Sequence, residues 1–171
     1  FKSLNEIHKK INNNGINYIF IPHEPEENIL KQIESNLLEL NIHNCRYTNM
    51  DHSKDINALI VDVVGILPDL YKFSSISYIG CGFSKGVHNV LEPAIYGNLI
   101  SFGPNYQILN EAIEMVENNL AESINSSEEL NIELMKITDN KLLDEKSELI
   151  MNYVYSKSII SKDLVREIQC D

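Results

Sequence analysis

The fold is decided by the stretch Tyr78-Ile-Gly-Cys-Gly-Phe-Ser-Lys-Gly-Val-His-Asn-Val-Leu-Glu-Pro-Ala-Ile-Tyr-Gly97. An apolar run of strand type passes here into a glycine-rich turn, and the turn opens directly into a predicted helix. Glycine lets the backbone approach an anion closely, and the N–H groups at a helix start carry the positive end of the helix dipole. Lys85 adds a mobile cation beside the turn. The stretch therefore predicts the phosphate-binding turn of an α/β protein.

The spacing of the glycines argues against the two best-known phosphate loops. The pattern Gly80-x-Gly82-x-x-x-Gly86 is one residue too long for the dinucleotide fingerprint. No Gly-Lys-Ser/Thr follows to make it a Walker loop. We therefore expect the anion to be held in a different way from that of NAD-binding proteins.

Strands and helices alternate along the first two thirds of the chain. Apolar runs typical of strands lie at residues 18–21, 45–48, 58–62, 76–79 and 99–102, and helical patterns lie at 4–11, 26–40, 67–73, 89–96 and 108–117. The C-terminal part, about 126–171, is predicted to be helical, with helices at 126–136, 142–155 and 162–168. This alternation favours a doubly wound (Rossmann-like) parallel sheet with helices on both faces, whose ligands bind beyond the carboxyl ends of the strands.

Length and charge set limits on the class of protein. The 171 residues are enough for one well-packed domain, which we expect to span residues 1–171. A formal net charge of -11 repels nucleic acid and anionic membranes, so we expect no nucleic-acid partner. No apolar run approaches the roughly 20 residues that cross a bilayer. Because the chain begins with Phe1, we expect a soluble piece of a longer protein.

Four motifs resemble, in order and spacing, those of the 3-deoxy-D-manno-octulosonic acid (Kdo) transferases. They are Pro22-His-Glu-Pro25, Asp62-x-x-Gly65-x-Leu67, Tyr78-Ile-Gly-x-Gly82 with His88-Asn-x-Leu-Glu-Pro93, and Gly103-Pro-Asn105, within residues 18–116. The resemblance implies the C-terminal, donor-binding half of a two-domain GT-B glycosyltransferase. Family members transfer Kdo from CMP-Kdo to a lipid A precursor in lipopolysaccharide biosynthesis, with inversion and with no essential metal or other cofactor. They act at the cytoplasmic side of the inner membrane of Gram-negative bacteria.

The resemblance also implies a CMP site in this chain. Its residues would be Gly80, Gly82, Ser84, Lys85, Gly86, His88, Asn89, Glu92, Gly65, Ile66, Leu67, His23 and Glu24. The glycine loop with Ser84 would hold the phosphate, while Asn89 and Glu92 would reach the phosphate side and the ribose hydroxyls. A carboxylate that accepts two vicinal hydroxyls makes directional, charge-assisted hydrogen bonds. The turn at residues 65–67 would lie against the cytosine, and His23 and Glu24 at the mouth of the site.

The chain departs from the family pattern in three ways. His23 stands where many members have arginine, and Cys81 stands where glycine is usual. The Gly-Ser-x-Trp-Pro stretch before the first helix does not occur in the sequence, nor does the N-terminal domain that holds the acceptor and the catalytic base. We therefore expect no catalytic residue and no metal ligand in this chain, and no transfer by the chain alone. An unpaired sheet edge, left by the absence of the first strand, would favour a homodimer.

Several of these residues also have ordinary structural uses. Asn89 and Glu92 fit an Asn-x-x-Glu capping box, and Asp62 could cap the turn that follows its strand. His88 could orient the loop rather than act as an acid or base, and Lys85 could be a solvated lysine. His23 and Glu24 could form a simple surface pair.

Two other functions fit the same pattern. The chain could be a GT-B domain for another nucleotide sugar, such as a UDP-sugar. It could also be a non-catalytic nucleotide-binding or assembly module that retains the fold without the activity. A preference for cytosine or for uracil nucleotides separates the CMP-Kdo domain from the UDP-sugar domain.

Overall fold

The computed structural model describes residues 4, 7, 8, 16–51 and 55–169, with side chains up to residue 158. The chain divides into two compact units, Phe1–Asp69 (unit 1) and Leu70–Asp171 (unit 2). Most of the helix predicted at residues 4–11 lies outside the described residues. The expectation of one domain over residues 1–171 stays a prediction, because two compact units can belong to one domain.

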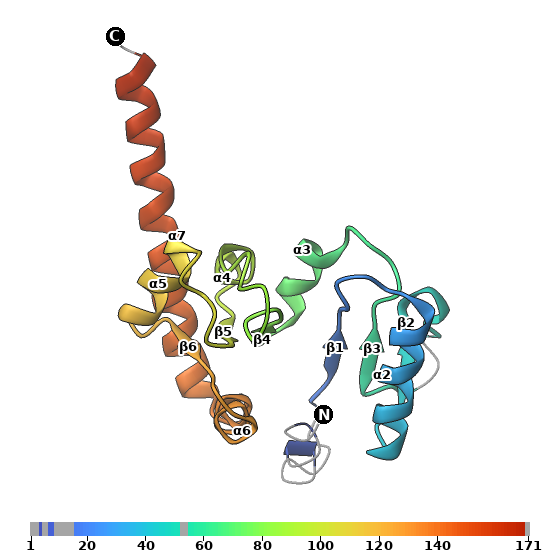
Figure 1. Ribbon diagram of the computed structural model, residues 1–171. Helices are drawn as coiled ribbons and strands as arrows, with labels where there is room; N and C mark the ends of the chain where they lie inside the picture. Colours follow the sequence, from blue (N-terminus) through green and yellow to red (C-terminus); the bar gives the residue numbers. More distant parts are fainter. Residues whose placement is uncertain (1–3, 5–6, 9–15, 52–54, 170–171) are drawn as a thin grey trace. The chain divides into compact units, whose positions relative to one another are not determined.

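Unit 1 contains a three-stranded parallel sheet with the strand order β1-β3-β2. The strands are β1 (Tyr18–Phe20), β2 (Asn44–Arg46) and β3 (Ala58–Ile60), and helix α2 (Glu27–Glu39) connects β1 to β2 (Figure 1). Tyr18 and Asn44 both pair with Ala58, which sets the register of the sheet. Short helical turns follow at η1 (Tyr47–Asn49) and at α3 (Leu67–Leu70).

Helix α2 covers the sheet of unit 1 with an apolar stripe. Leu30 and Leu37 of this helix are buried with Ala58 and Ile60 of β3. The spacing of seven residues places both leucines on the same helix face. The guanidinium of Arg46 also ties β2 to the helix, because it donates to Glu34 Oε1 and to Glu27 Oε2, each at 2.7 Å.

Unit 2 contains a second parallel sheet, with the order β4-β5-β6. The strands are β4 (Ile76–Ile79), β5 (Leu99–Phe102) and β6 (Ala121–Ser123), and Figure 1 shows β5 between the other two. All four residues of β5 are buried. Since successive side chains of a strand point to opposite faces, both faces of this strand are covered.

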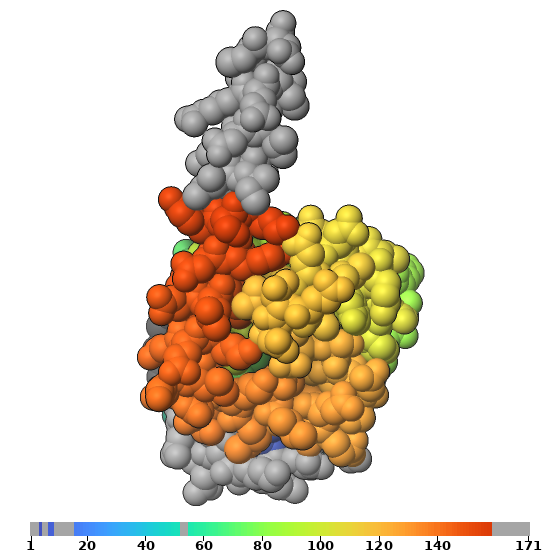
Figure 2. Space-filling model, turned by 90° about the vertical axis from the view of Figure 1, so that its left-hand side faces the viewer, coloured from blue at the N-terminus to red at the C-terminus, as the bar shows by residue number. Residues whose placement is uncertain are grey.

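The helices of unit 2 pack around this central strand. They are η2 (Tyr71–Phe73), α4 (Leu91–Ile95), α5 (Asn110–Glu117), α6 (Ser127–Met135), η3 (Lys136–Thr138) and α7 (Asn140–Gln169). Phe102, Met115 and Ile150 bring β5, α5 and α7 into one buried cluster. The Tyr153 hydroxyl donates to Glu114 Oε2 at 2.8 Å, and Lys157 pairs with the same oxygen. In Figure 2, helix α7 (orange to red) lies beside helix α5 (yellow).

The predicted fold class, α/β with parallel strands and helices packed on them, is confirmed. The six described strands form two three-stranded sheets, whereas the sequence suggested a single sheet. The prediction of separate helices at residues 142–155 and 162–168 is wrong, because α7 runs without a break from Asn140 to Gln169. The segment between the two predicted helices contains neither glycine nor proline, so nothing in it interrupts the helix.

The capping box predicted at Ser126 is present. The Ser126 hydroxyl accepts a hydrogen bond from the Glu129 N–H at 3.1 Å, and Glu129 Oε2 accepts one from the Asn125 N–H at 2.8 Å. Within the described residues, no helix combines the length and the apolar character needed to cross a membrane.

Candidate functional site

The segments after β4 and β5 lie side by side at the carboxyl edge of the unit 2 sheet. The Asn105 N–H donates to the Gly82 carbonyl at 2.8 Å, and the Val87 N–H donates to the Asn105 carbonyl at 3.0 Å. The Asn105 side-chain amide also donates to the Ser84 carbonyl at 3.2 Å. These bonds fix the glycine-rich loop, residues 80–86, to the Gly103-Pro-Asn105 turn. We call this pair of segments the loop pair.

Two glycines are required by the geometry of the loop pair. A Cβ atom on Gly82 would lie 2.7 Å from Gly103 Cα, so the two backbones pass with no room for a side chain. Gly86 has φ +103°, in the region that favours glycine, and a Cβ there would lie 3.2 Å from the Asn105 carbonyl oxygen. Gly80 differs, because a Cβ at that position would meet no atom within 4 Å. The space beside Gly80 is therefore open.

Cys81 turns the chain sharply at the start of the loop. It has φ +68°, a conformation that a glycine adopts at lower cost, which agrees with the usual glycine of the resembling family at this position. Its carbonyl accepts hydrogen bonds from the N–H groups of Ser84 at 2.9 Å and Gly86 at 3.0 Å, and from the Ser84 hydroxyl at 3.3 Å. The predicted phosphate ligand Ser84 is thus occupied within the loop.

Other donors of the same loop have no partner in the described part of the chain. The backbone N–H groups of Gly82, Phe83 and Lys85 make no hydrogen bond to it, and the exposed Lys85 ammonium makes no ion pair with it. Unpaired N–H groups in a glycine-rich turn, next to a cation, are the groups that bind anions. The loop therefore has three N–H groups and one ammonium left for a phosphate; Phe83 and Lys85 are exposed, whereas Gly82 is buried.

Asn89 fills the structural role that its sequence position allowed. Its Oδ1 accepts hydrogen bonds from the N–H groups of Leu91 at 3.0 Å and Glu92 at 3.2 Å, so it caps the first turn of α4. Pro93 is the third residue of this helix, where the absence of an N–H loses no intrahelical bond. Glu92 is half-buried, and burial followed by the charge of Glu92 raises the pKa of Tyr71. The charge of Glu92 thus acts on Tyr71 in η2.

A hollow of about 210 Å³ opens beside α4. Its lining residues are His88, Asn89, Val90, Leu91, Leu109 and Glu111. His88 and Asn89 belong to the predicted site, and the structure places them beside the start of α5. Sequence reasoning missed Glu111, because an acidic residue in the first turn of a helix is ordinary and gives no sign of a site.

The remaining predicted residues belong to unit 1. His23 and Glu24 follow β1 and are exposed, and residues 65–67 follow β3. Since β1 and β3 are neighbouring parallel strands, both segments start from the carboxyl edge of that sheet. That they form one site with the loop pair stays a prediction.

Asp62 is engaged inside unit 1. Its carboxylate accepts hydrogen bonds from the Thr48 N–H, at 3.0 Å, and from the Thr48 hydroxyl. Desolvation acts to raise the pKa of Asp62, but the bonds from Thr48, the Asp62 N–H and the charge of Arg46 together lower it below its usual value. The side chain thus fixes the turn η1 against the end of β3.

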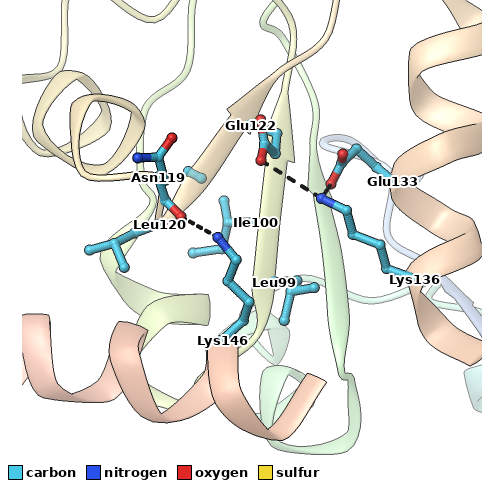
Figure 3. Close-up of a pocket in the computed structure, with 9 residues that line it drawn as sticks. Leu99, Ile100, Asn119, Leu120, Glu122, Glu133, Lys136 and Lys146 are labelled. Atoms are coloured by element: carbon cyan, nitrogen blue, oxygen red, sulfur yellow. Dashed lines mark hydrogen bonds and ion pairs between the residues drawn. The ribbon is translucent and has the colours of Figure 1, made fainter. Parts of the chain in front are cut away.

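A second, much smaller pocket lies at the opposite end of the unit 2 strands (Figure 3). It is lined by the first residues of β5 and β6 and has a volume of about 10 Å³, enough for about one water molecule. Lys136 pairs there with Glu133 at 2.6 Å and Glu122 at 3.7 Å, and Lys146 donates to the Asn119 carbonyl at 2.6 Å. These charges are satisfied by the protein itself. The described residues contain no group of three or more His, Cys, Asp or Glu side chains placed to hold a metal ion.

Comparison with curated proteins identifies relatives that are much longer than this chain. It is 32% identical over 118 residues to the 3-deoxy-D-manno-octulosonic acid transferase of Rickettsia typhi, which covers 66% of this chain and 24% of the relative. The enzyme of the same name from Chlamydia trachomatis serovar D is 30% identical over 111 residues, which covers 64% of this chain and 23% of the relative. A bifunctional glycosyltransferase/methyltransferase of Fusobacterium nucleatum is 26% identical over 164 residues, 88% of this chain and 26% of the relative. The chain thus spans about a quarter of the length of these relatives. No protein-family model matches it.

A solved structure shares the fold. The C-terminal CMP-Kdo binding domain of WaaA from Acinetobacter baumannii matches with a TM-score of 0.64 at 14% sequence identity, over 90% of this chain and 96% of that chain. The resemblance indicated by the four motifs is therefore confirmed: the chain is a relative of the 3-deoxy-D-manno-octulosonic acid transferases, with the fold of a C-terminal domain of this family.

Proposed function

We propose that this chain is the donor-binding domain of a Kdo-transferring glycosyltransferase and that its loop pair binds the phosphate of CMP-Kdo. The names of its relatives describe Kdo transferases, and the matching solved domain is described as CMP-Kdo binding. The observation that carries the proposal is the loop pair itself. Its close Gly82–Gly103 contact fixes a turn whose Gly82, Phe83 and Lys85 N–H groups are unpaired in the described chain.

Local donors are needed because the whole chain is acidic. A net charge of -11 repels a nucleotide phosphate, so binding depends on a cluster that overcomes the global field. In the proposal the phosphate takes the three unpaired N–H groups and the Lys85 ammonium. Asn89 uses its Oδ1 for the helix cap, which leaves its Nδ2 as a donor toward the phosphate side. Glu92 accepts the ribose hydroxyls.

The predicted ligand residues of unit 1 are also part of the proposal. The backbone at Gly65, Ile66 and Leu67 would read the cytosine edge, and His23 and Glu24 would lie at its mouth. Gly65, His23 and Glu24 are exposed, so each is available to a ligand.

The complete reaction requires parts that lie outside these 171 residues. We propose an inverting transfer of Kdo to a lipid A precursor at the cytoplasmic side of the inner membrane of a Gram-negative bacterium. The base that activates the acceptor hydroxyl would come from the acceptor domain. The chain by itself is then inactive, and product formation from CMP-Kdo and a lipid A precursor with this chain alone would contradict the proposal.

We also propose that the isolated chain forms homodimers, which would elute earlier than a monomer from a sizing column.

The proposed function is tested by an amide NMR titration of the 171-residue chain with CMP, UMP and AMP. Saturable shifts between Gly80 and Glu92 that are strongest with CMP are the expected result. Equal shifts with UMP would replace the proposal with a domain for a UDP-sugar. Absence of shifts at millimolar CMP would favour a non-catalytic assembly module.

A further inference from the structure

The hollow beside α4 is too small for a whole nucleotide sugar. Its volume of about 210 Å³ lies below the roughly 300–1,000 Å³ of pockets that enclose a drug-sized ligand. It adjoins the loop pair, since only Val87 separates residues 80–86 from His88 and Asn89. A ligand whose phosphate occupies the loop can therefore place one of its other parts in the hollow.

Glu111 is the acidic group of this hollow, and it has no partner within the described residues. The contrast with Glu114, one turn later on α5, is clear. Glu114 accepts a hydrogen bond from Tyr153 and pairs with Lys157, which fastens α5 to α7. Glu111 makes no hydrogen bond or ion pair in the described chain and lines the hollow. Its carboxylate is available to a ligand.

The chemistry of the lining selects the part of the ligand that fits. A carboxylate repels a phosphate but accepts hydrogen bonds from hydroxyl groups, and such charge-assisted bonds are strong and directional. Val90, Leu91 and Leu109 supply apolar walls, and the imidazole of His88 supplies a ring nitrogen that can take part in a hydrogen bond. Glu92 does not line the hollow. The lining matches the hydroxyl groups of a sugar better than it matches a phosphate.

We infer that the hollow receives the transferred sugar of the donor and that Glu111 accepts hydrogen bonds from the hydroxyl groups of this sugar. The inference rests on the proposed function and adds a specificity-determining residue to it. Glu111 also lies in the first turn of α5, where the helix dipole favours a carboxylate. A purely structural role would change stability without distinguishing one ligand from another, so the test must compare ligands.

The experiment measures the affinities of the 171-residue chain for CMP and for freshly prepared CMP-Kdo. The variants are Glu111→Ala, Glu111→Gln and the matched control Glu117→Ala, which changes an exposed glutamate of the same helix outside the hollow. We expect the wild type to bind CMP-Kdo more tightly than CMP. Glu111→Ala should weaken CMP-Kdo about tenfold or more, with CMP changed less than about twofold. Glu111→Gln, which keeps one acceptor oxygen, should lie between, and Glu117→Ala should change neither affinity.

Other outcomes overturn the inference. If the wild type binds CMP and CMP-Kdo equally, or if Glu111→Ala weakens both by the same factor, Glu111 does not contact the transferred sugar, while the proposed function stands. A loss of CMP affinity in Glu111→Ala that disappears with 2′-deoxy-CMP would assign Glu111 to the ribose and exclude the transferred sugar. If the wild type binds neither ligand, the proposed function fails, and the inference fails with it.

Discussion

The backbones of Gly82 and Gly103 pass so closely that a Cβ atom on Gly82 would lie 2.7 Å from Gly103 Cα. Gly82 follows β4 and Gly103 follows β5, two neighbouring parallel strands. Their contact is where the phosphate loop is fastened to the sheet. Backbone that is fixed before the ligand arrives costs less free energy to order on binding.

Gly82→Ala should destabilise the protein and weaken CMP binding. The added methyl group forces two backbone segments apart, and overpacking of this kind costs about 1–3 kcal/mol of unfolding free energy. Gly80→Ala is the matched control, because its methyl group meets no atom within 4 Å. Urea unfolding measures the difference. Equal midpoints for the two variants would show that the loop pair is not held as described.

Asn89 variants separate the helix cap from ligand binding. Asn89→Ala removes the acceptor of the Leu91 and Glu92 N–H groups and should cost about 0.5–2 kcal/mol of unfolding free energy. Asn89→Asp keeps the acceptor, so unfolding should return close to the wild-type value. It also replaces the Nδ2 donor by a negative charge, so CMP affinity should stay low. If Asn89→Asp recovered both the unfolding free energy and the CMP affinity of wild type, Asn89 would act only as a helix cap.

Lys85→Ala should weaken CMP but not cytidine. The exposed ammonium adds a charge interaction with a phosphate, worth about 1 kcal/mol or less at such a surface, which is about fivefold or less in affinity. The effect should shrink as salt rises, because salt screens exposed charges. Titrations at low and high salt measure it, with Lys141→Ala as a control lysine on α7. An equal loss of affinity for cytidine would show that Lys85 does not act on the phosphate.

Glu114 makes stability depend on pH on the acid side. Hydrogen bonds from Lys157 and then Tyr153 lower the pKa of Glu114 below its ordinary value of about 4.5. The unfolded chain binds this proton first as pH falls, so the contribution is full above pH about 4.5 and is lost as pH falls through the folded pKa. Glu114→Gln should be less stable than wild type at neutral pH. The difference between the urea unfolding midpoints of wild type and Glu114→Gln should narrow as pH falls. A difference that stays constant would rule out this linkage.

Local sequence was enough to predict the elements that carry the loop pair. Strands β4 and β5 have the bounds predicted, because each is a short apolar run with turn-forming residues on both sides. Strand β6 was missed, since Ala121–Ser123 has no strand-like composition and becomes a strand only by pairing with β5. The division into two sheets likewise depends on contacts between residues far apart in the chain.

The candidate site shows the same limit. Gly82 and Gly86 could be predicted from spacing, because a phosphate turn needs glycines within a few residues of one another. The hollow could not be predicted, because it forms where residues 88–91 meet the start of α5, some twenty residues later. Glu111 becomes a candidate binding residue only because this contact between distant segments places it in the lining of the hollow. Asn89 had two readings in the sequence, and only the structure shows that its Oδ1 is used by the helix.

The most direct test of the central claim compares CMP with cytidine by amide NMR on the same protein, following Gly82, Phe83 and Lys85. If the unpaired N–H groups of the loop hold the phosphate, CMP should shift these three amides strongly, and cytidine at equal saturation should leave them nearly unchanged. The ³¹P signal of CMP should move in the same titration. Identical shifts with both ligands, or shifts with neither on these amides while CMP binds, would contradict the claim that this loop is the phosphate site.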